Sequence, residues 1–441
     1  MSGTIPAVRY LHPPSPVLHT SRFIRGATDF IYENCGRDGA VLGLSGGIDS
    51  DIVCEIGLKA LGSDMHAVHL DTGFMRKGEC DEVVGFFGPR LGDNLVFADY
   101  VAQEFLDAMM NVRYADLKPG EEIAEVKRHV FKGVYWPVLA RECSRFGVPS
   151  LLQGSIWPDI IESTKRAEGD AVIKSHHNVN PKMDSDVIKR IVEPMAGCYK
   201  NEERHLAKAL GLPDWITYRM TFPGPSLTVR IVGEITPENL EIEREANHIV
   251  ETGVTNDVMR QYGVPMYIEA NGNHIPWMAF SYTMRAQTHG DEERINMAQD
   301  VIQRTLKGRY KLNGCWLMED KMTGVKGDVR AYFRPLLVEI QDARGEPCYD
   351  HDVMEEVSLA LTSPPELQLT RVLGVTHMNE NGGTHLVGMR AIESQRTMEA
   401  RFMRLEENLM REMSEEIADI PGVGIVAYEW DHKPPSTMEP E

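Results

Sequence analysis

The sequence predicts an α/β fold, a doubly wound parallel sheet, followed by an α+β domain that contains an internal duplication. Three observations lead to this prediction. Short apolar runs alternate with helical patterns as far as Leu212, which is typical of a parallel sheet covered by helices. A set of strand and helix patterns between residues 336 and 428 occurs twice. The chain has 441 residues, more than one hydrophobic core usually holds, so we expect at least two domains.

The predicted elements follow from the spacing of apolar residues. Helical spacing predicts helices at residues 21–35, 79–87, 101–110, 238–251 and 292–306. Short apolar runs predict strands at residues 40–44, 66–70 and 149–154. The repeated strand–helix–strand pattern covers residues 336–340, 350–361 and 370–375, and then 386–392, 399–417 and 423–428. The two copies are offset by about fifty residues, enough for one supersecondary unit.

The expected domain boundaries follow from composition. Residues 1–17 are rich in proline and predict a flexible arm. Residues 18–230 are expected to form the parallel-sheet domain. Residues 231–441 are expected to form the second domain, after the Pro/Gly hinge Phe222-Pro223-Gly224-Pro225.

Composition excludes several classes of function. The 46 basic and 66 acidic residues give a formal net charge of −20, and such a surface repels nucleic acid. The seven cysteines are scattered without a C-x-x-C pair, so we expect no zinc site, dithiol redox site or disulfide framework. No apolar run reaches about 18 residues and the start lacks an apolar signal core, so we expect a soluble cytoplasmic protein without a membrane partner.

The segment Ser45 to Ser50, SGGIDS, lies between a predicted strand and a predicted helix. Its two glycines let backbone N–H groups turn inward at the helix N-terminus, which suits phosphate oxygens. It has no lysine, so a Walker A loop and kinase-type chemistry are disfavoured. The Asp49 carboxylate would repel a polyphosphate unless a divalent cation lay between them, so we interpret Asp49 as a Mg²⁺ ligand. The alternative is a surface turn in which Asp49 is an N-terminal helix charge.

The six residues match SGG(V/I)DS and resemble the loop of the ATP pyrophosphatase (PP-loop) superfamily, whose fold is adenine nucleotide alpha hydrolase-like. The resemblance implies that the loop binds the pyrophosphate end of ATP and that the α-phosphate passes to a substrate oxygen as AMP. The implied ATP-binding residues are Ser45, Gly46, Gly47, Ile48, Asp49, Ser50 and Asp51. Asp49 is also expected to be catalytic.

A narrower resemblance rests on five separated stretches in the same order. They are DTGFMRK at 71–77, QGSIWPDIIES at 153–163, IKSHHNV at 173–179, FPGPSLTVR at 222–230 and KPPSTME at 433–439. Together they resemble the ATP-pyrophosphatase chain of GMP synthetases or a close paralogue. The duplicated second domain is similar to the enlarged C-terminal region of eukaryotic-type members, and is expected to bind the substrate and to dimerise.

The resemblance implies further roles for residues that match the family pattern. The resemblance implies that residues 173–179 form a lid over the ATP site, on which Lys174 would neutralise charge as pyrophosphate leaves. The alternative is that Lys174 is a solvated loop lysine. Asp159 by itself would be read as an N-terminal helix charge. The implied substrate contacts are Arg128, Gln153, Asp159, Asp328, Gln368, Lys433 and Glu439.

The implied reaction is the ATP-dependent amination of XMP to GMP through an adenylyl-XMP intermediate, with release of AMP and pyrophosphate. The sequence lacks the G-x-C-x-G elbow of a fused glutaminase, so we expect free ammonia or a separate glutaminase subunit as the nitrogen source. Either a monomer or a homodimer is expected, because the duplication can supply within one chain what bacterial forms obtain by dimerising.

Two alternatives remain open from the sequence. One is a paralogue that adenylylates another purine or a small carbonyl substrate, and the other is a non-catalytic nucleotide-binding regulator. Three departures from the family pattern motivate the first, namely Met220-Thr221, Ser226 and Pro440. A further departure, Asn180-Pro181 after the stretch 173–179, is expected to stiffen the backbone there. The intact loop and Lys174 count against the second.

The last stretch, residues 433–441, carries its own expectation. Pro434-Pro435 would hold it extended so that Lys433 and Glu439 reach the bound nucleotide. We therefore expect that its removal abolishes product formation and leaves thermal stability intact.

Overall fold

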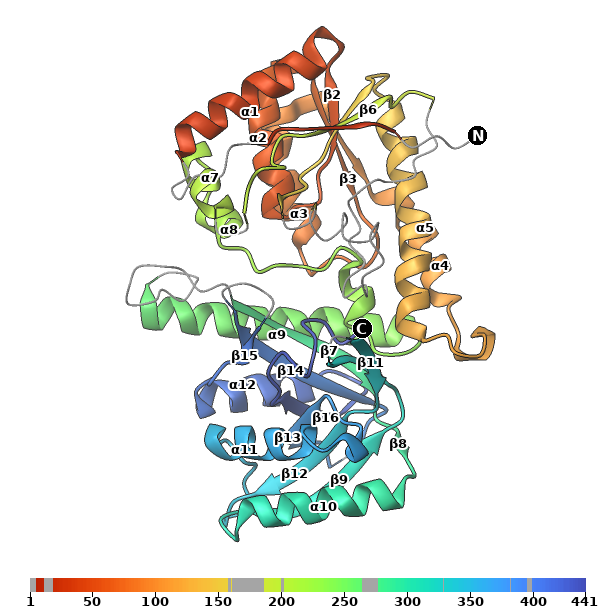
Figure 1. Cartoon of the computed structure of the whole chain (residues 1–441), viewed down its shortest axis with the longest axis vertical. Coiled ribbons are helices and arrows are strands. Elements are labelled where there is room, and N and C mark those ends of the chain that lie inside the picture. The colour runs from red at the N-terminus through yellow and green to blue at the C-terminus, as the bar shows by residue number, and fades with distance from the viewer. Residues whose placement is uncertain are drawn as a thin grey trace. The chain divides into compact units, whose positions relative to one another are not determined.

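The computed structural model describes residues 5–11, 19–157, 160, 186–199, 202–263, 277–327, 329–380, 382–394 and 399–441. The chain divides into two compact units (Figure 1). The first comprises Met1–Met109 and His129–Gly224, and the second comprises Met110–Arg128 and Pro225–Glu441.

The first unit contains a six-stranded sheet in the order β1-β6-β5-β2-β3-β4, and all of its strand pairs are parallel. The strands are β1 (Ala7–Arg9), β2 (Ala40–Gly43), β3 (Met65–Leu70), β4 (Leu95–Ala98), β5 (Ser150–Leu152) and β6 (Arg190–Glu193). From β2 the chain moves outward to β3 and β4, and then returns to β5 on the other side of β2. This confirms the predicted doubly wound sheet.

Helices cover both faces of this sheet. They are α1 (Thr20–Cys35), α2 (Ile48–Leu61), α3 (Glu79–Leu91), α4 (Ala102–Met110), α5 (Ile123–Ser144), α7 (Glu203–Leu210) and α8 (Asp214–Thr217). Buried residues of α1, α2, α3 and α7 share one apolar cluster with the sheet, including Phe23, Ile52 and Phe87. On α4 and α5, Phe105 and Phe131 pack together with ring centroids 5.3 Å apart. Figure 1 shows α4 and α5 across the sheet from α1 and α2.

The expected flexible arm is wrong for its central part. Residues Ala7 to Arg9 form the edge strand β1, parallel to β6. The Arg9 guanidinium also donates to the Glu193 carboxylate at 2.6 Å. A parallel edge strand is held by backbone hydrogen bonds to its neighbour and needs no apolar pattern of its own. This explains why the sequence did not predict β1. Residues 1–4 and 12–17 of the expected arm lie outside the described residues.

The second unit contains an eight-stranded mixed sheet in the order β15-β14-β16-β13-β12-β9-β8, and β7 also pairs with β14. A separate hairpin joins β10 and β11. The strands are β7 (Trp277–Arg285), β8 (Thr288–His289), β9 (Lys311–Met318), β10 (Met322–Lys326), β11 (Val329–Phe333), β12 (Leu336–Gln341), β13 (Val372–Met378), β14 (His385–Glu393), β15 (Arg401–Phe402) and β16 (Val423–Glu429).

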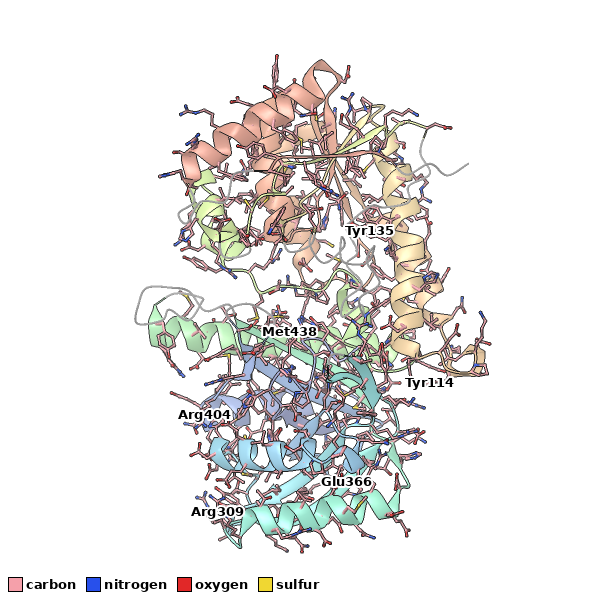
Figure 2. All side chains as sticks on the ribbon, in the orientation of Figure 1. Tyr114, Tyr135, Arg309, Glu366, Arg404 and Met438 are labelled. Atoms are coloured by element: carbon pink, nitrogen blue, oxygen red, sulfur yellow. The ribbon has the colours of Figure 1, made fainter. Side chains whose placement is uncertain are left out.

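Four helices lie along one face of this sheet: α9 (Pro237–Tyr262), α10 (Glu292–Leu306), α11 (His351–Thr362) and α12 (Glu407–Ala418). Helix α9 packs on β7 and α12, α12 on β13 and β16, and α11 on β13 and α10 (Figure 1). On the other face, alternate residues of β7, such as Phe280 and Tyr282, enter a core cluster. Met438 of the chain end packs on this cluster and is labelled in Figure 2.

The repeated pattern corresponds to two strand–helix–strand motifs. β12, α11 and β13 form one motif with parallel strands, and β14, α12 and β16 form the other. β13 and β16 meet in the middle of the sheet and are antiparallel to each other. The two motifs therefore run in opposite directions from a common centre. Their origin by duplication stays a prediction.

Among the described residues, no helix combines the length and the apolar character that crossing a membrane requires.

Candidate functional site

The predicted phosphate loop connects the carboxyl end of β2 to the first turn of α2. Ser50 closes it, because its hydroxyl donates to the Gly47 carbonyl at 2.8 Å and accepts from the Ser45 N–H at 3.2 Å. The Ser45 and Ser50 hydroxyl oxygens are 3.0 Å apart. Ser45 and Gly47 are exposed, and the Gly47 N–H donates to the Ser45 hydroxyl at 3.3 Å. A ligand at the N-terminus of α2 would therefore replace this weak hydrogen bond within the loop.

The loop conformation requires a glycine at position 46. Gly46 has φ of +79°, in the left-handed region that glycine adopts without steric cost. A Cβ atom there would lie 2.5 Å from a methyl carbon of Val83. The Gly46 backbone therefore packs closely against α3, which fixes the path of the loop.

A second segment approaches the loop from β5. Strands β2 and β5 are neighbours, and the chain leaves them in opposite directions, so a crevice is expected at their carboxyl ends. Gly154 follows β5, and a Cβ atom there would lie 3.1 Å from the backbone carbon and Cβ of Asp49. Gln153 is buried, and its N–H donates to the Val192 carbonyl at 3.0 Å. The structure thus brings the predicted residues Gln153 and Asp49 to the same edge of the sheet.

Two carboxylates of the first turn of α2 differ in environment. Asp49 is half-buried, whereas Asp51 is 1% exposed. Burial raises the pKa of Asp51 to about 8, although the Arg219 guanidinium and the Ser50 hydroxyl, 3.3 Å away, favour the charged form. Asp51 is therefore largely protonated near neutral pH, and its buried carboxyl group lies next to the hydroxyl of the loop residue Ser50.

The fit of Mg²⁺ depends on Asp49. Mg²⁺ usually keeps several waters and binds one or two carboxylates together with substrate phosphates. One half-buried carboxylate beside a phosphate loop fits that pattern. In the described part of the chain, no group of three or more His, Cys, Asp or Glu residues could hold a metal without a ligand. The Asp49 carboxylate would thus hold the ion jointly with phosphate oxygens.

A buried charge cluster behind the loop was not predicted from the sequence. The Glu79 carboxylate accepts from the Arg76 guanidinium at 2.9 Å and lies 3.6 Å from the Arg219 guanidinium. Arg219 also donates to the Gly46 carbonyl at 2.9 Å. Burial alone would raise the pKa of Glu79, but the two guanidinium groups outweigh it and hold the pKa below its ordinary value. Arg76 lies in a motif singled out above, whereas no pattern connects Arg219 to the loop.

In the second unit, Arg128 belongs to a cluster around Glu125. The Glu125 carboxylate accepts from Arg128 at 2.7 Å and is also bound by Arg330 and the Tyr332 hydroxyl. Arg330 and Tyr332 belong to strand β11. Burial would raise the pKa of Glu125, but these donors hold it below its ordinary value. The cluster places two guanidinium groups on one carboxylate, and the Arg128 side chain is 13% exposed.

Lys127, the neighbour of Arg128, is fully buried. Its ammonium group pairs with the Glu441 carboxylate and donates to the Gly233 carbonyl at 3.0 Å. Glu441 in turn accepts from the Gly233 N–H at 2.8 Å. Burial lowers the pKa of Lys127 and raises that of Glu441. The composition of the charged segment 120–128 alone suggests a solvated helix start, and the burial of Lys127 contradicts this interpretation.

The chain end is packed rather than extended. The Ser436 N–H donates to the His432 carbonyl at 3.2 Å, which closes a turn at the two prolines. The carbonyls of Pro435 and Pro440 accept from Val325 and Thr323 of β10, each at 2.7 Å. The expected extended tail is therefore wrong, because backbone hydrogen bonds to β10 determine its path.

Two buried arginines hold the same segment. Arg371 and Arg390 share the Glu429 carboxylate, which is also fully buried. Arg371 donates to the Thr437 hydroxyl at 2.8 Å, and Arg390 donates to the Ser436 hydroxyl at 2.7 Å. The chain end thus rests on an ionic cluster in the sheet of the second unit.

The remaining predicted residues occupy varied positions. Glu439 pairs with the buried Arg230 guanidinium at 3.2 Å. Lys433 is half-buried, and its backbone pairs with Ala400. Gln368 is exposed with φ of +49°. The predicted residues Lys174, Asp159 and Asp328 lie outside the described residues.

Ser226, one of the departures noted above, has φ of +57°. The left-handed conformation is the one that the glycine of the family pattern would adopt freely. The substitution therefore preserves the local backbone path at a conformational cost. The preserved backbone path weakens Ser226 as a motive for a paralogue with another substrate.

Comparisons with known proteins match both halves of the chain. The NAD synthase family model matches residues 23–96, and the GMP synthase C terminal domain model matches residues 346–440. One subunit of the glutamine-hydrolyzing GMP synthase of Pyrococcus horikoshii is 37% identical over 281 residues, 64% of this chain and 81% of that protein. The corresponding protein of Methanoculleus marisnigri is 41% identical over 236 residues, 53% of this chain and 71% of that protein.

Among solved structures, an NH3-dependent NAD synthetase from Campylobacter jejuni aligns with 47% of this chain and 81% of its own. Its identity is 18% and its TM-score is 0.34.

Proposed function

Because this chain belongs to the GMP synthase family, we propose that it catalyses the ATP-dependent amination of XMP to GMP. The matching families are those of ATP-dependent carbon–nitrogen ligases, and the chain is an enzyme of that class. The observation that carries the proposal is the closed Ser45 to Ser50 loop at the switch point of a parallel sheet, a site suited to phosphates.

The first step is an adenylyl transfer. The C2 oxygen of XMP attacks the α-phosphate of ATP and forms a new P–O bond, while the bond to the β-phosphate breaks and its electron pair leaves with pyrophosphate. The exposed Gly47 N–H would exchange its hydrogen bond to the Ser45 hydroxyl for one to the departing pyrophosphate, and the Ser45 hydroxyl would donate to the same group. Mg²⁺, when bound at Asp49, supplies neutralising charge. Lys174, outside the described residues, is proposed to act on the same charge.

The second step is amination. Ammonia attacks C2, the C2–O bond breaks, AMP leaves with its electron pair, and the nitrogen loses its extra proton to solvent. The relatives are individual subunits of enzymes named for glutamine hydrolysis. We therefore propose a separate glutaminase subunit as the ammonia source, with free ammonia as the alternative.

The proposed XMP contacts begin with Arg128. An arginine suits a nucleotide 5′-phosphate, because its planar fork can donate two hydrogen bonds to phosphate oxygens. The Arg330 guanidinium on the same carboxylate adds positive charge there. Gln153, Gln368, Lys433 and Glu439 are proposed as further contacts, together with Asp159 and Asp328, which lie outside the described residues.

The domain proposal keeps the boundaries inferred from the sequence. Residues 18–230 are proposed as the ATP-pyrophosphatase domain and residues 231–441 as the substrate-binding domain. The compact units differ from these boundaries, because Met110–Arg128 and the residues from Pro225 onward belong to the second unit. The two strand–helix–strand motifs that meet at β13 and β16 support an internal duplication in the second domain.

The test is to incubate the protein with ATP, Mg²⁺ and ammonium together with XMP or IMP in separate reactions. We expect AMP and pyrophosphate, with GMP as the aminated product, in the XMP reaction alone. A product formed with a different nucleotide would identify a paralogue. The absence of AMP in every reaction would favour a nucleotide-binding regulator.

A further inference from the structure

Arg219 links the phosphate loop to a segment far away in the sequence. Its guanidinium donates to the Gly46 carbonyl at 2.9 Å, across a separation of 173 residues. The Arg219 side chain is 10% exposed. Among the loop's hydrogen bonds described above, this one comes from a charged donor, and such bonds are stronger than neutral ones.

The guanidinium is held from several sides. It lies 3.6 Å from the Glu79 carboxylate and pairs with the Glu82 carboxylate, both on α3. Its carbon lies 5.4 Å from the centre of the Trp215 ring, within the range of a cation–π contact. Three kinds of contact therefore fix its direction before any ligand arrives.

The electrostatics of the loop require such a group. Asp51 and Glu79 are buried behind the loop, and both interact electrostatically with Arg219. Bound pyrophosphate would add several negative charges next to the exposed residues Ser45 and Gly47. A peptide carbonyl turned toward that anion would repel it, whereas the Gly46 carbonyl is turned toward Arg219.

We propose that Arg219 is a positioning residue for the pyrophosphate end of ATP. It holds the Gly46 peptide so that the carbonyl faces the buried cluster, and the exposed Ser45 hydroxyl and Gly47 N–H, which are 3.3 Å apart, can exchange their mutual hydrogen bond for bonds to phosphate oxygens. It also balances the negative charge of the buried Glu79 carboxylate. This inference deepens the proposed function and rests on the loop as the pyrophosphate site.

Arg90 offers a matched control in the same unit. Its guanidinium carbon lies 3.6 Å from the centre of the Phe86 ring, and its Nε atom lies 3.2 Å from the Glu55 carboxylate. It donates to the Phe86 carbonyl at 2.7 Å, within its own helix. Arg90→Gln therefore removes the same three kinds of contact without touching the loop.

The experiment measures binding of magnesium pyrophosphate and of AMP to the full chain by calorimetry. We expect Arg219→Gln to weaken pyrophosphate binding by about ten- to a hundredfold and AMP binding by less than about threefold. Arg219→Lys keeps the charge and loses the fork, so we expect partial rescue. Arg90→Gln should bind both ligands as the wild type does. Thermal unfolding of each variant is recorded without ligand.

Wild-type pyrophosphate affinity in Arg219→Gln would overturn the proposal, as would an equal loss of pyrophosphate and AMP binding. If Arg219→Gln does not fold, wild-type pyrophosphate affinity in Arg219→Lys has the same meaning. A wild-type protein that does not bind pyrophosphate would overturn it as well. No turnover is measured, so a failure of XMP as the substrate does not affect the outcome.

Discussion

Asp49 is the residue on which the chemistry of the loop depends most directly. Asp49 is half-buried in the first turn of α2, and its backbone and Cβ lie close to Gly154. We predict that Asp49→Asn removes most adenylylation, because a neutral amide is a weaker Mg²⁺ ligand than a carboxylate. Pyrophosphate release is measured across a Mg²⁺ titration. The control is Asp81→Asn, an exposed carboxylate in the first turn of α3.

The unfolding temperature of Asp49→Asn should stay close to that of the wild type, so that lost activity reports chemistry. Pyrophosphate release at the wild-type rate would show that Asp49 does not hold the metal.

Asp51 gives a prediction about stability and pH. Its pKa is raised from 3.8 to about 8 in the folded state. Between these pH values the folded protein keeps a proton that the unfolded chain has released, so the free energy of unfolding falls as pH rises. Above about 8 the carboxyl is charged in both states and its effect is constant. Asp51→Asn mimics the protonated form, and its amide N–H can donate to the Ser50 hydroxyl oxygen, which lies 3.3 Å from the Asp51 carboxyl group.

We therefore expect Asp51→Asn to gain stability relative to the wild type as pH rises, by on the order of 2 kcal/mol between pH 6 and pH 8. Urea unfolding at each pH measures it. The difference between the two proteins is used because Glu243, whose pKa burial also raises to about 8, contributes in both. Parallel pH profiles would contradict the assignment.

At the scale of elements, the chain end is part of the fold of the second unit. The Lys127–Glu441 pair is fully buried, and removal of one partner leaves a buried charge uncompensated. We predict that Lys127→Met lowers the free energy of unfolding by about 3–5 kcal/mol, and that Lys127→Met with Glu441→Gln recovers part of it. Urea unfolding measures both variants. The buried contacts of residues 433–441 therefore argue against the expectation that they can be removed without loss of stability.

The control for that pair is the exposed pair Lys118–Glu121, whose side chains are 83% and 41% exposed. Lys118→Met should cost no more than about 1 kcal/mol. Equal effects of Lys118→Met and Lys127→Met would mean that burial of the second pair has no energetic consequence.

Lys433 tests whether the chain end also binds the nucleotide. Its backbone pairs with Ala400, and an alanine can keep those bonds. We predict that Lys433→Ala weakens XMP binding by about ten- to a hundredfold and leaves ATP binding unchanged. Calorimetry with each nucleotide measures this. Lys326→Ala, which removes an ammonium group that donates to the Thr362 carbonyl at 2.7 Å, is the control.

If Lys433→Ala bound XMP as tightly as the wild type, the chain end would be structural alone.

The sequence was sufficient wherever one element determines the local structure. The predicted 292–306 helix is α10, and the predicted loop joins β2 to α2. The sequence was insufficient where segments that are far apart in the chain meet, because no local pattern identifies the partner of a side chain. Arg219 reaches a loop 173 residues earlier, and Lys127 pairs with Glu441. Edge strand β1 is similar, because its three residues depend on β6 for every hydrogen bond of the pairing.

At the scale of the whole molecule, the second unit has a centre of two antiparallel strands with equivalent motifs on either side. β13 and β16 bring the two strand–helix–strand motifs together, and β9 and β7 add an antiparallel strand next to β12 and β14. One chain therefore builds a wide sheet that two copies of a single motif could build by pairing. This arrangement keeps both a monomer and a homodimer open.

The nitrogen source is also a property of the whole chain, and the cysteines bear on it. A glutaminase nucleophile needs a thiol of lowered pKa. All seven cysteines lie in the described ranges; Cys80 is partly exposed and the other six are buried. Burial raises the pKa of every one of them, to about 12 for Cys80 and about 11 for Cys348. These thiols are therefore poorly suited to attack glutamine.

We predict that the purified chain aminates XMP with ammonium salts and not with glutamine, and that the rate rises with pH as the ammonia fraction grows. Rates at several pH values should fall on one curve when plotted against the concentration of free ammonia. Pyrophosphate release measured without ammonium at each pH separates this effect from changes in adenylylation, to which the titration of Asp51 would contribute. Addition of an independent glutaminase should restore amination with glutamine, because it releases ammonia into solution. Turnover with glutamine by the isolated chain would show that one of the seven thiols, or another group, is a nucleophile despite its environment.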